Sequence, residues 1–266
     1  MKFRKSANPS AEMPFLDHLE ELRWRILWSV IALTVASIGS FFVVTYFDVI
    51  GLLKRPAEQY LMNNDGKLVY LAVTDPFFIT LRLAISMGFV VASPIIFYQV
   101  WAFLSPALMP RERRAIVPSL YMGLVLFLGG AALAYFFALP FTMKFMTGFQ
   151  SESLVQMITA NDYFGFVLKL MLGFGVMFEM PVIIMILTAV GLANSRFLRE
   201  KRRYAFAAIA VAAAMITPGD VIVPTLILLG PLALLYEASI VLARLVERKR
   251  RSEVEESSSD ALPEGA

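Results

Sequence analysis

Long apolar stretches recur along this chain and are separated by shorter polar connections. About 20 consecutive apolar residues are enough for a helix to cross a bilayer core of roughly 30 Å. Four runs reach that length, and two shorter ones follow near the carboxyl end. The long runs are residues 26–47, 77–104, 116–139 and 163–190, and the short runs are residues 204–216 and 221–236. The pattern predicts an all-α integral membrane protein.

The two short runs are separated by Thr217-Pro218-Gly219-Asp220, a sequence that breaks helices. The first of them, 13 residues long, extends only about 20 Å as a helix. This pair must therefore form either two thin, locally mismatched spans or a re-entrant hairpin. Both arrangements return the chain to the same side, so the apolar pattern leaves the choice open.

Basic residues gather in alternate connections, and this orients the chain. Lys and Arg accumulate on the cytoplasmic side of membrane proteins. Of the 24 Lys and Arg residues, 18 lie before the first run, in the second and fourth connections, or after residue 242, and 4 lie in the alternate connections. The distribution predicts that both termini are cytoplasmic. Arg82 and Lys169 remain inside apolar runs, near enough to their ends to snorkel.

Composition agrees with a membrane location and excludes several kinds of site. Hydrophobic residues make up 58% and charged residues 17% of the 266 residues, and mean hydropathy is +0.68. Without cysteine, the chain has no disulfide framework, thiolate metal site or cysteine nucleophile. His18 is the only histidine and lies outside the runs, which disfavours an intramembrane hydrolase or a metal site. We expect no nucleic-acid partner.

One membrane domain, residues 1–246, accounts for all six runs. It includes a segment of about residues 13–24 in which Phe15, Leu16, Leu19 and Leu22 have the spacing of an amphipathic helix. Residues 247–266 are rich in arginine, glutamate and serine and predict a disordered cytoplasmic tail. No sustained internal repeat of the kind found in many solute transporters is present.

Several segments occur in the order found in one known family. They are the amphipathic segment FLDHLEELR (15–23), the segment YQVWAFLSPAL (98–108) followed by RERR (111–114), FEMP (178–181) and TPGD (217–220). With them, nearly the whole chain resembles the TatC family, the signal-peptide receptor of the twin-arginine protein translocase. The resemblance implies six transmembrane helices with short fifth and sixth ones.

The resemblance also implies a function in binding and assembly at the bacterial cytoplasmic membrane, without enzymatic chemistry or a bound cofactor. The implied partners are twin-arginine signal peptides of folded proteins, single-span subunits of the TatA and TatB types, other copies of the chain and the lipid bilayer. A solute transporter or a membrane scaffold is the alternative.

Two carboxylates, Glu21 and Glu112, are the expected ligand-binding residues, because the topology puts both at the cytoplasmic surface among arginines. Guanidinium groups bind carboxylates bidentately, a geometry that lysine does not reproduce. Arg23 belongs to the same predicted site. The alternative is structural: Glu21 pairs with Arg25 one helical turn later, and Glu112 is neutralised by its arginine neighbours.

An apolar contribution is expected from Phe103 and Leu108, at the cytoplasmic end of the second run. A charge-assisted hydrogen bond contributes roughly 1.5–3 kcal/mol, whereas micromolar affinity needs about 8 kcal/mol. Apolar contacts must therefore add to the carboxylates. The alternative for Phe103 is an aromatic anchor at the membrane interface.

Glu179 lies in the middle of the fourth run, where an unpaired charge costs about 2.5–3.5 kcal/mol on insertion scales. It must face a cavity or a partner, or be protonated. Pro181 cannot donate a backbone hydrogen bond to the Met177 carbonyl, so polar backbone is expected at the same level. Two interpretations of Glu179 are consistent with the sequence. It belongs to a hydrated patch that perturbs the bilayer for passage of the transported protein, or it makes a buried structural hydrogen bond.

Thr217 and Asp220 lie at the tip between the two short runs, where the family docks its single-span subunits. Capping of the last helix by Asp220 is the alternative. Pro224 occupies a position where better-known members have glutamine. This difference argues against a polar docking cluster at the tip. Pro56 also matches a family position and is interpreted as a rigid turn in the first outer loop.

Overall fold

The computed structural model describes residues 15–60, 68–104, 116–148, 157–189, 191–217 and 222–259. These residues are almost entirely helical, and within them the only strand-like pairing is an isolated bridge between Val69 and Thr159. The helices, in chain order, are α1 (Phe15–Tyr46), α2 (Val49–Lys54), the 3-10 helix η1 (Arg55–Tyr60), α3 (Asp75–Leu104), α4 (Ile116–Leu133), the π-helix η5 (Ala134–Ala138), α5 (Leu139–Gly148), α6 (Ala160–Phe178), α7 (Met180–Ala189), α8 (Ser195–Glu200), α9 (Arg202–Ile216) and α10 (Ile222–Ser259).

Five helical segments of the described chain are long and apolar enough to cross a membrane. They are Asp17–Tyr46, Asp75–Phe103, Pro118–Gly148, Ala160–Ala189 and Leu228–Arg248. A sixth apolar helix, α9, has only 15 residues and extends about 22 Å, which agrees with the short fifth span that the family resemblance implies. The prediction of an all-α, multi-pass membrane protein is confirmed.

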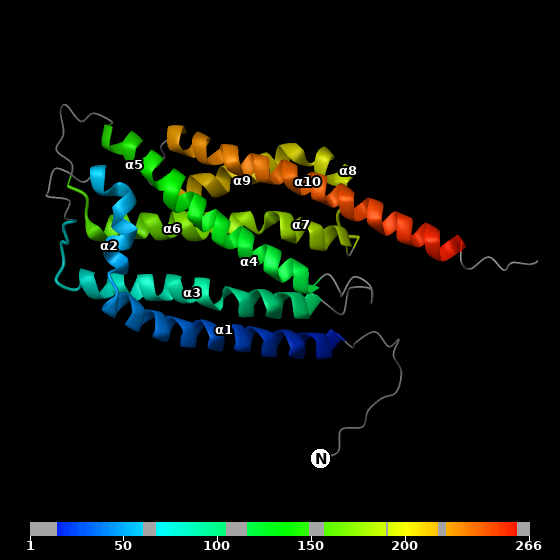
Figure 1. The fold of residues 1–266 in the computed structure, drawn as a ribbon, viewed down its shortest axis with the longest axis horizontal. Helices are drawn as coiled ribbons and strands as arrows, with labels where there is room; N and C mark the ends of the chain where they lie inside the picture. Colours follow the sequence, from blue (N-terminus) through cyan, green and yellow to red (C-terminus); the bar gives the residue numbers. More distant parts are fainter. Residues whose placement is uncertain are drawn as a thin grey trace, which may run out of the picture.

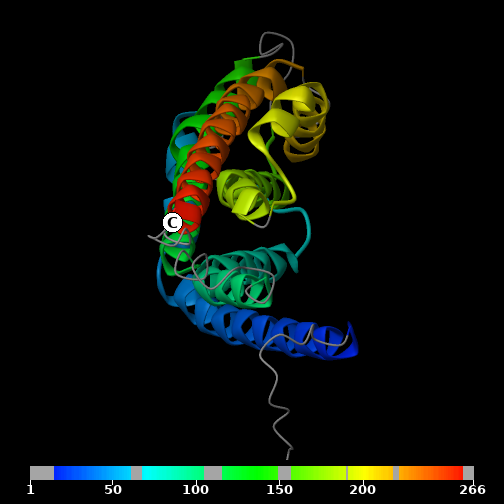
Figure 2. The same cartoon turned by 90° about the vertical axis from the view of Figure 1, so that its right-hand side faces the viewer.

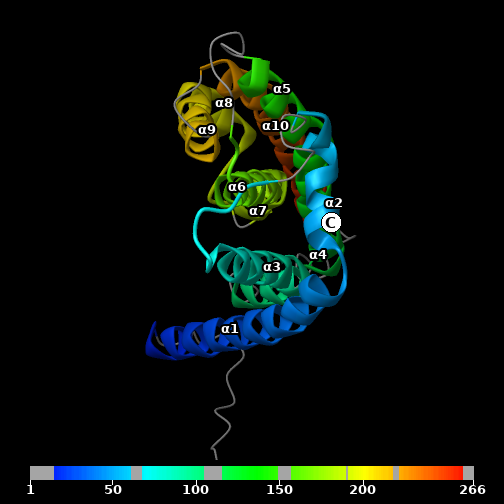
Figure 3. The ribbon, with the colours of Figure 1, turned by 90° about the vertical axis from the view of Figure 1, so that its left-hand side faces the viewer.

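The long helices lie side by side in a curved wall (Figures 1 and 2). α1 forms one edge and packs on α3, α6 and α7 run through the centre, and α8 and α9 lie at the other edge beside α10 (Figure 3). α1 begins and α10 ends at the same end of the bundle, which we call the terminal end. α3 and α6 begin at the other end, which we call the opposite end.

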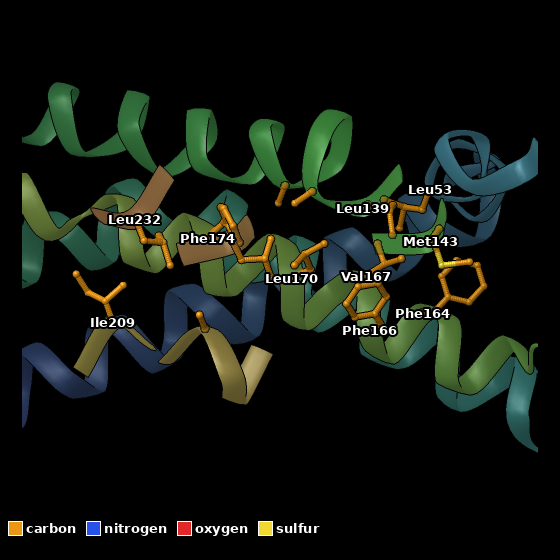
Figure 4. Packing of buried hydrophobic residues seen from close by; sticks show 14 of the residues in the cluster. Leu53, Leu139, Met143, Phe164, Phe166, Val167, Leu170, Phe174, Ile209 and Leu232 are labelled. Atoms are coloured by element: carbon orange, nitrogen blue, oxygen red, sulfur yellow. The ribbon is translucent and has the colours of Figure 1, made fainter. Parts of the chain in front are cut away.

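The core is built around α6. Val167, Leu170 and Phe174 are fully buried and belong to one cluster with residues of α5, α9 and α10 (Figure 4). Leu139 and Leu232, on α5 and α10, are also fully buried in that cluster. In a membrane such a core is held by close van der Waals packing rather than by exclusion from water, because lipid tails are as apolar as leucine. Shape complementarity therefore decides which helix faces meet.

Glycines mark the closest helix contacts. A Cβ atom added at Gly130 of α4 would lie 2.7 Å from the Phe174 backbone oxygen, and one at Gly88 of α3 would lie 2.6 Å from the Ser37 Cα of α1. Real Cβ atoms essentially never come so close to backbone. Small residues let backbones approach in this way, as in many membrane helix pairs. α4 with α6, and α1 with α3, are thus held at glycine contacts.

Polar contacts connect neighbouring helices at both ends of the bundle. At the opposite end, the Tyr163 hydroxyl of α6 donates to the Leu53 carbonyl of α2 at 2.9 Å. At the terminal end, the Glu247 carboxylate of α10 accepts hydrogen bonds from the backbone N–H and the hydroxyl of Ser195, both at 2.6 Å. Arg202 also donates to Glu237 at 2.7 Å. The hydrogen bonds of Ser195 and Arg202 connect the short helices α8 and α9 to α10.

The chain ends differ in detail from the sequence expectations. The amphipathic segment predicted for about residues 13–24 is the first part of α1, which continues into the first span without interruption. α10 extends beyond the predicted apolar run 221–236 and remains helical to Ser259, inside the tail for which disorder is predicted. Arginine, lysine and glutamate are good helix formers, so the backbone hydrogen bonding continues past the apolar residues.

Candidate functional site

Five side chains from α1 and α3 meet at the terminal end of the bundle. We call His18, Glu21, Arg25, Gln99 and Phe103 the α1–α3 cluster. The helical spacing of residues 18, 21 and 25 puts them on one face of α1. Gln99 and Phe103 are one turn apart on α3, and the packing of the two helices brings these faces together.

Glu21 is the centre of the cluster. Its Oε1 atom accepts two hydrogen bonds from Arg25, through Nε at 2.9 Å and through Nη2. Its Oε2 atom is buried and has no hydrogen-bond partner among the described residues, and His18 Nδ1 lies 3.6 Å away. The pair with Arg25 that the sequence allows is therefore present, but it uses only one carboxylate oxygen. The other accepts no hydrogen bond from the described residues and is shielded from solvent by the side chains around it.

Two contacts join the cluster across the helix boundary. Arg25 Nη1 donates to Gln99 Oε1 at 3.4 Å. The rings of His18 and Phe103 are stacked, with centroids 4.3 Å apart and planes 10° from parallel. Phe103, predicted to contact the ligand, is half-buried within this stack. The structure thus brings Glu21 and Phe103 to the same cluster.

An apolar groove begins at the cluster and follows the seam between α1 and α3. Its volume is 220 Å³. Arg25, Gln99 and Phe103 lie at its polar end. Its other lining residues are apolar or carry a hydroxyl: Leu22, Ile26, Ser29, Val30, Leu33, Ile96 and Val100. The groove has room for aliphatic side chains beside the Glu21 carboxylate.

The other residues predicted for this site are not in the cluster. Arg23 is exposed and lies two residues from Glu21, so the two side chains point to nearly opposite sides of α1. Glu112 and Leu108 lie outside the described residues, as does Asp220 of the predicted docking tip. Their roles stay sequence predictions.

Sequence reasoning missed His18 and Gln99 as members of the site. His18 lies one turn before Glu21, so the i,i+3 spacing on α1 could have suggested it. Gln99 is 74 residues from Arg25 in the sequence. No local signal indicates that pairing, because it depends on how α3 packs against α1.

Glu179 lies at the junction between α6 and α7, where it interrupts the regular helix. Its backbone N–H donates to the Val176 carbonyl at 3.1 Å. Pro181, two residues later, has no N–H to donate. The side chain is buried against α4, with Oε2 2.9 Å from where a Gly123 Cβ would be. Its Oε1 atom has no hydrogen-bond partner among the described residues. These residues supply no structural hydrogen bond to that atom.

The remaining predicted residues have local contacts. Thr217 is buried at the end of α9, and its hydroxyl donates to the Ala213 carbonyl at 2.8 Å. Pro56 is the second residue of η1, where its fixed φ suits the first turn of a helix. No group of three or more potential metal ligands of the His, Cys, Asp or Glu types occurs within the described ranges.

Comparison with known proteins places this architecture in one family. The family described as "Sec-independent protein translocase protein (TatC)" matches residues 17–231. A protein of that name from Koribacter versatilis is 37% identical over 97% of this chain and 96% of its own length. One from Aquifex aeolicus is 38% identical over 90% of this chain and 98% of its own.

A solved structure shares both fold and sequence with this chain. It is described as the crystal structure of the twin-arginine translocase receptor TatC, and it superposes with a TM-score of 0.77 at 36% identity. The match covers 86% of this chain and 99% of that structure. The relatives are components of a protein translocase, a transport family rather than an enzyme family. The chain belongs to the TatC family of Sec-independent protein translocase proteins.

Proposed function

We propose that this protein is the receptor and core subunit of a twin-arginine translocase. It binds the signal peptides of folded proteins at the α1–α3 cluster and then nucleates the translocation complex. The observation that carries the proposal is the buried Oε2 atom of Glu21, which has no hydrogen-bond partner among the described residues and lies beside an apolar groove. The description of the solved relative as a receptor supports the same role.

The chemistry of the cluster suits a ligand that combines arginine with apolar residues. A guanidinium group entering the site donates to Oε2 of Glu21, while Arg25 continues to hold Oε1. The aliphatic residues of the signal peptide lie in the groove. Glu112 is the predicted second carboxylate for the second arginine.

The proposed orientation has both termini in the cytoplasm of a bacterium, with the protein in its inner membrane. The distribution of 18 basic residues against 4 supports it. The position of the α1–α3 cluster at the terminal end agrees, because signal peptides are presented from the cytoplasm. The opposite end, with α2 and η1, then faces outward.

Partner subunits of the TatA and TatB types are proposed to dock along the membrane face of the bundle. Glu179 is the first proposed contact: its Oε1 atom lacks a described hydrogen-bond partner within a membrane span, and a partner reaches it once its burial against α4 is relieved. The tip with Thr217 and Asp220 is the second proposed contact. The protein works by binding and assembly, together with other copies of itself, and not as an enzyme.

Removing the Glu21 charge is expected to weaken signal-peptide binding selectively. We expect Glu21→Gln to lower the affinity for a twin-arginine peptide by at least about tenfold, because one charge-assisted hydrogen bond is lost. A twin-lysine peptide should bind the parent protein about as weakly as the twin-arginine peptide binds the Glu21→Gln variant, because lysine lacks the bidentate geometry. Affinity can be measured by fluorescence anisotropy with the protein in nanodiscs.

Glu200→Gln is the matched control, since Glu200 also pairs with an arginine four residues away and lies in α8 at the terminal end. It should leave the affinity unchanged. Equal binding of the arginine and lysine peptides by the parent, unaffected by Glu21→Gln, would contradict the receptor proposal. The function would then move toward a membrane scaffold or a solute transporter.

Arg25 competes with the ligand for Glu21 in this arrangement. Arg25→Gln should therefore raise the affinity for a twin-arginine peptide by about threefold to tenfold, because the carboxylate loses its internal guanidinium partner. Arg196→Gln removes the same charge from α8, where Arg196 pairs with Glu200, and should have little effect. Weaker binding after Arg25→Gln would show instead that Arg25 holds Glu21 in its binding position.

A further inference from the structure

Two cationic side chains lie within the membrane-crossing segments near the opposite end of the bundle. Arg82 is seven residues after the start of α3, and Lys169 is nine residues after the start of α6. These positions are about 10 Å and 14 Å along the helix axes. Both side chains are exposed. Cations at such depths are costly in lipid and rare, and when present they mark a functional site by default.

The two cations lie on neighbouring helices, α3 and α6. Arg82 Nη1 donates to Asn161 Oδ1 of α6 at 2.7 Å, which joins α3 to α6. Lys169 lies on the exposed face of α6, two turns beyond Asn161 and opposite the buried face with Leu170 and Phe174. Figures 2 and 3 show α3 and α6 as neighbouring helices.

No described carboxylate neutralises either cation. Among the described residues, the ion pairs within 4.0 Å do not include Arg82 or Lys169. The acidic residue closest in sequence on α6, Asp162, is seven residues before Lys169 and accepts a hydrogen bond from the Thr159 hydroxyl at 2.6 Å. Asn161, the partner of Arg82, is neutral. Neither cation therefore has a carboxylate within 4.0 Å among the described residues.

The flanking residues on both helices are apolar. Phe78 and Ile85, one turn to either side of Arg82 on α3, are exposed. On α6, Val176 lies two turns beyond Lys169 toward the bilayer centre and is also exposed. Cations near one membrane surface, continued toward the centre by exposed apolar side chains, match the shape of a phospholipid.

We propose that Arg82, Asn161 and Lys169 form a binding site for the headgroup phosphate of an anionic phospholipid. The lipid belongs to the leaflet at the opposite end of the bundle, and its acyl chains lie along Ile85 and Val176. Phosphate is the anion that the bilayer supplies near this depth, and long Arg and Lys side chains snorkel toward it. A lipid with net negative charge is favoured over a zwitterionic one, because it compensates the two cations without adding an ammonium group.

Native mass spectrometry of the full-length protein tests this site, with dioleoylphosphatidylglycerol and dioleoylphosphatidylcholine as the probes. The parent should bind the anionic lipid at least about tenfold more tightly than the zwitterionic one. The double variant Arg82→Gln/Lys169→Gln should lose that preference. Arg82→Lys/Lys169→Arg keeps both charges and should retain most of it, and it serves as the test if the first variant folds poorly.

Lys144→Gln is the matched control, because Lys144 is an exposed lysine of α5 at the same end of the bundle. It should bind both lipids as the parent does. Equal affinity of the parent for the two lipids would overturn the proposal. A preference for the anionic lipid that survives in the double glutamine variant would also overturn it. The two cations would then be assigned to another anion, such as an acidic side chain of a partner span. Signal-peptide binding is not needed for either result.

Discussion

Replacing Gly130 by leucine is expected to destabilise the whole bundle. A Cβ atom at this position meets the Phe174 backbone oxygen at 2.7 Å and the Phe178 Cβ at 2.9 Å, so α4 must move away from α6. Phe174 is fully buried in the main core. The atom that the new Cβ meets belongs to the Phe174 backbone, which cannot move aside as a flexible side chain does. We expect the free energy of unfolding to fall by about 3 kcal/mol or more. Reversible SDS denaturation in mixed micelles, followed by circular dichroism, measures it.

The neighbouring glycine is the control for this prediction. Gly129 has no atom within 4 Å of its ideal Cβ position and is exposed, so Gly129→Leu should change the free energy of unfolding by less than about 1 kcal/mol. Both substitutions change helix propensity and apolar surface in the same way. If the two variants were equally stable, the close contact between α4 and α6 would not be what holds the core together.

Replacing Gly88 by leucine should separate α1 from α3 and abolish signal-peptide binding. The new Cβ atom would lie 2.6 Å from the Ser37 Cα and 2.7 Å from its backbone nitrogen, so α1 must shift. Glu21 on α1 and Phe103 on α3 then lose their common cluster. We expect the affinity for a twin-arginine peptide to fall by more than about tenfold, while α4, α6 and α10 remain packed.

The control for this variant lies on α1 itself. Gly39→Leu adds the same side chain where no atom lies within 4 Å, and the affinity should stay close to that of the parent. Peptide anisotropy measures the binding, and disulfide crosslinking between cysteines introduced at His18 and Phe103 reports the helix separation. Full crosslinking together with lost binding in Gly88→Leu would contradict the explanation, because the cluster would still be assembled.

The predictions of apolar runs and chain topology followed from local properties. The run 77–104 corresponds to α3, and the missing N–H of Pro181 predicts unpaired backbone near Glu179, where the structure divides the fourth run into α6 and α7. The pair Glu21–Arg25 followed from its i,i+4 spacing. Each of these features depends on residues within one or two helical turns, so a single sequence is enough to predict them.

The contacts between helices did not follow from the sequence. In a soluble protein an apolar stripe marks the buried face, but in a membrane the lipid-facing side is as apolar as the core. Val35 and Ile38 of α1 are exposed although they are as apolar as its buried Val44. Gly129 and Gly130 are adjacent in sequence, yet only the second touches another helix.

By itself, the sequence determined the class of protein, the approximate extent of four long apolar runs and two short ones, and the segments that resemble the TatC family. It did so because length, apolarity and charge decide whether a helix crosses a bilayer. Only the tertiary structure decided that His18 stacks on Phe103, that Arg25 reaches Gln99, and that Arg82 joins Asn161 beside the exposed face of Lys169. Those contacts depend on the rotation of each helix about its axis, and close packing at glycines, rather than apolarity, sets that rotation.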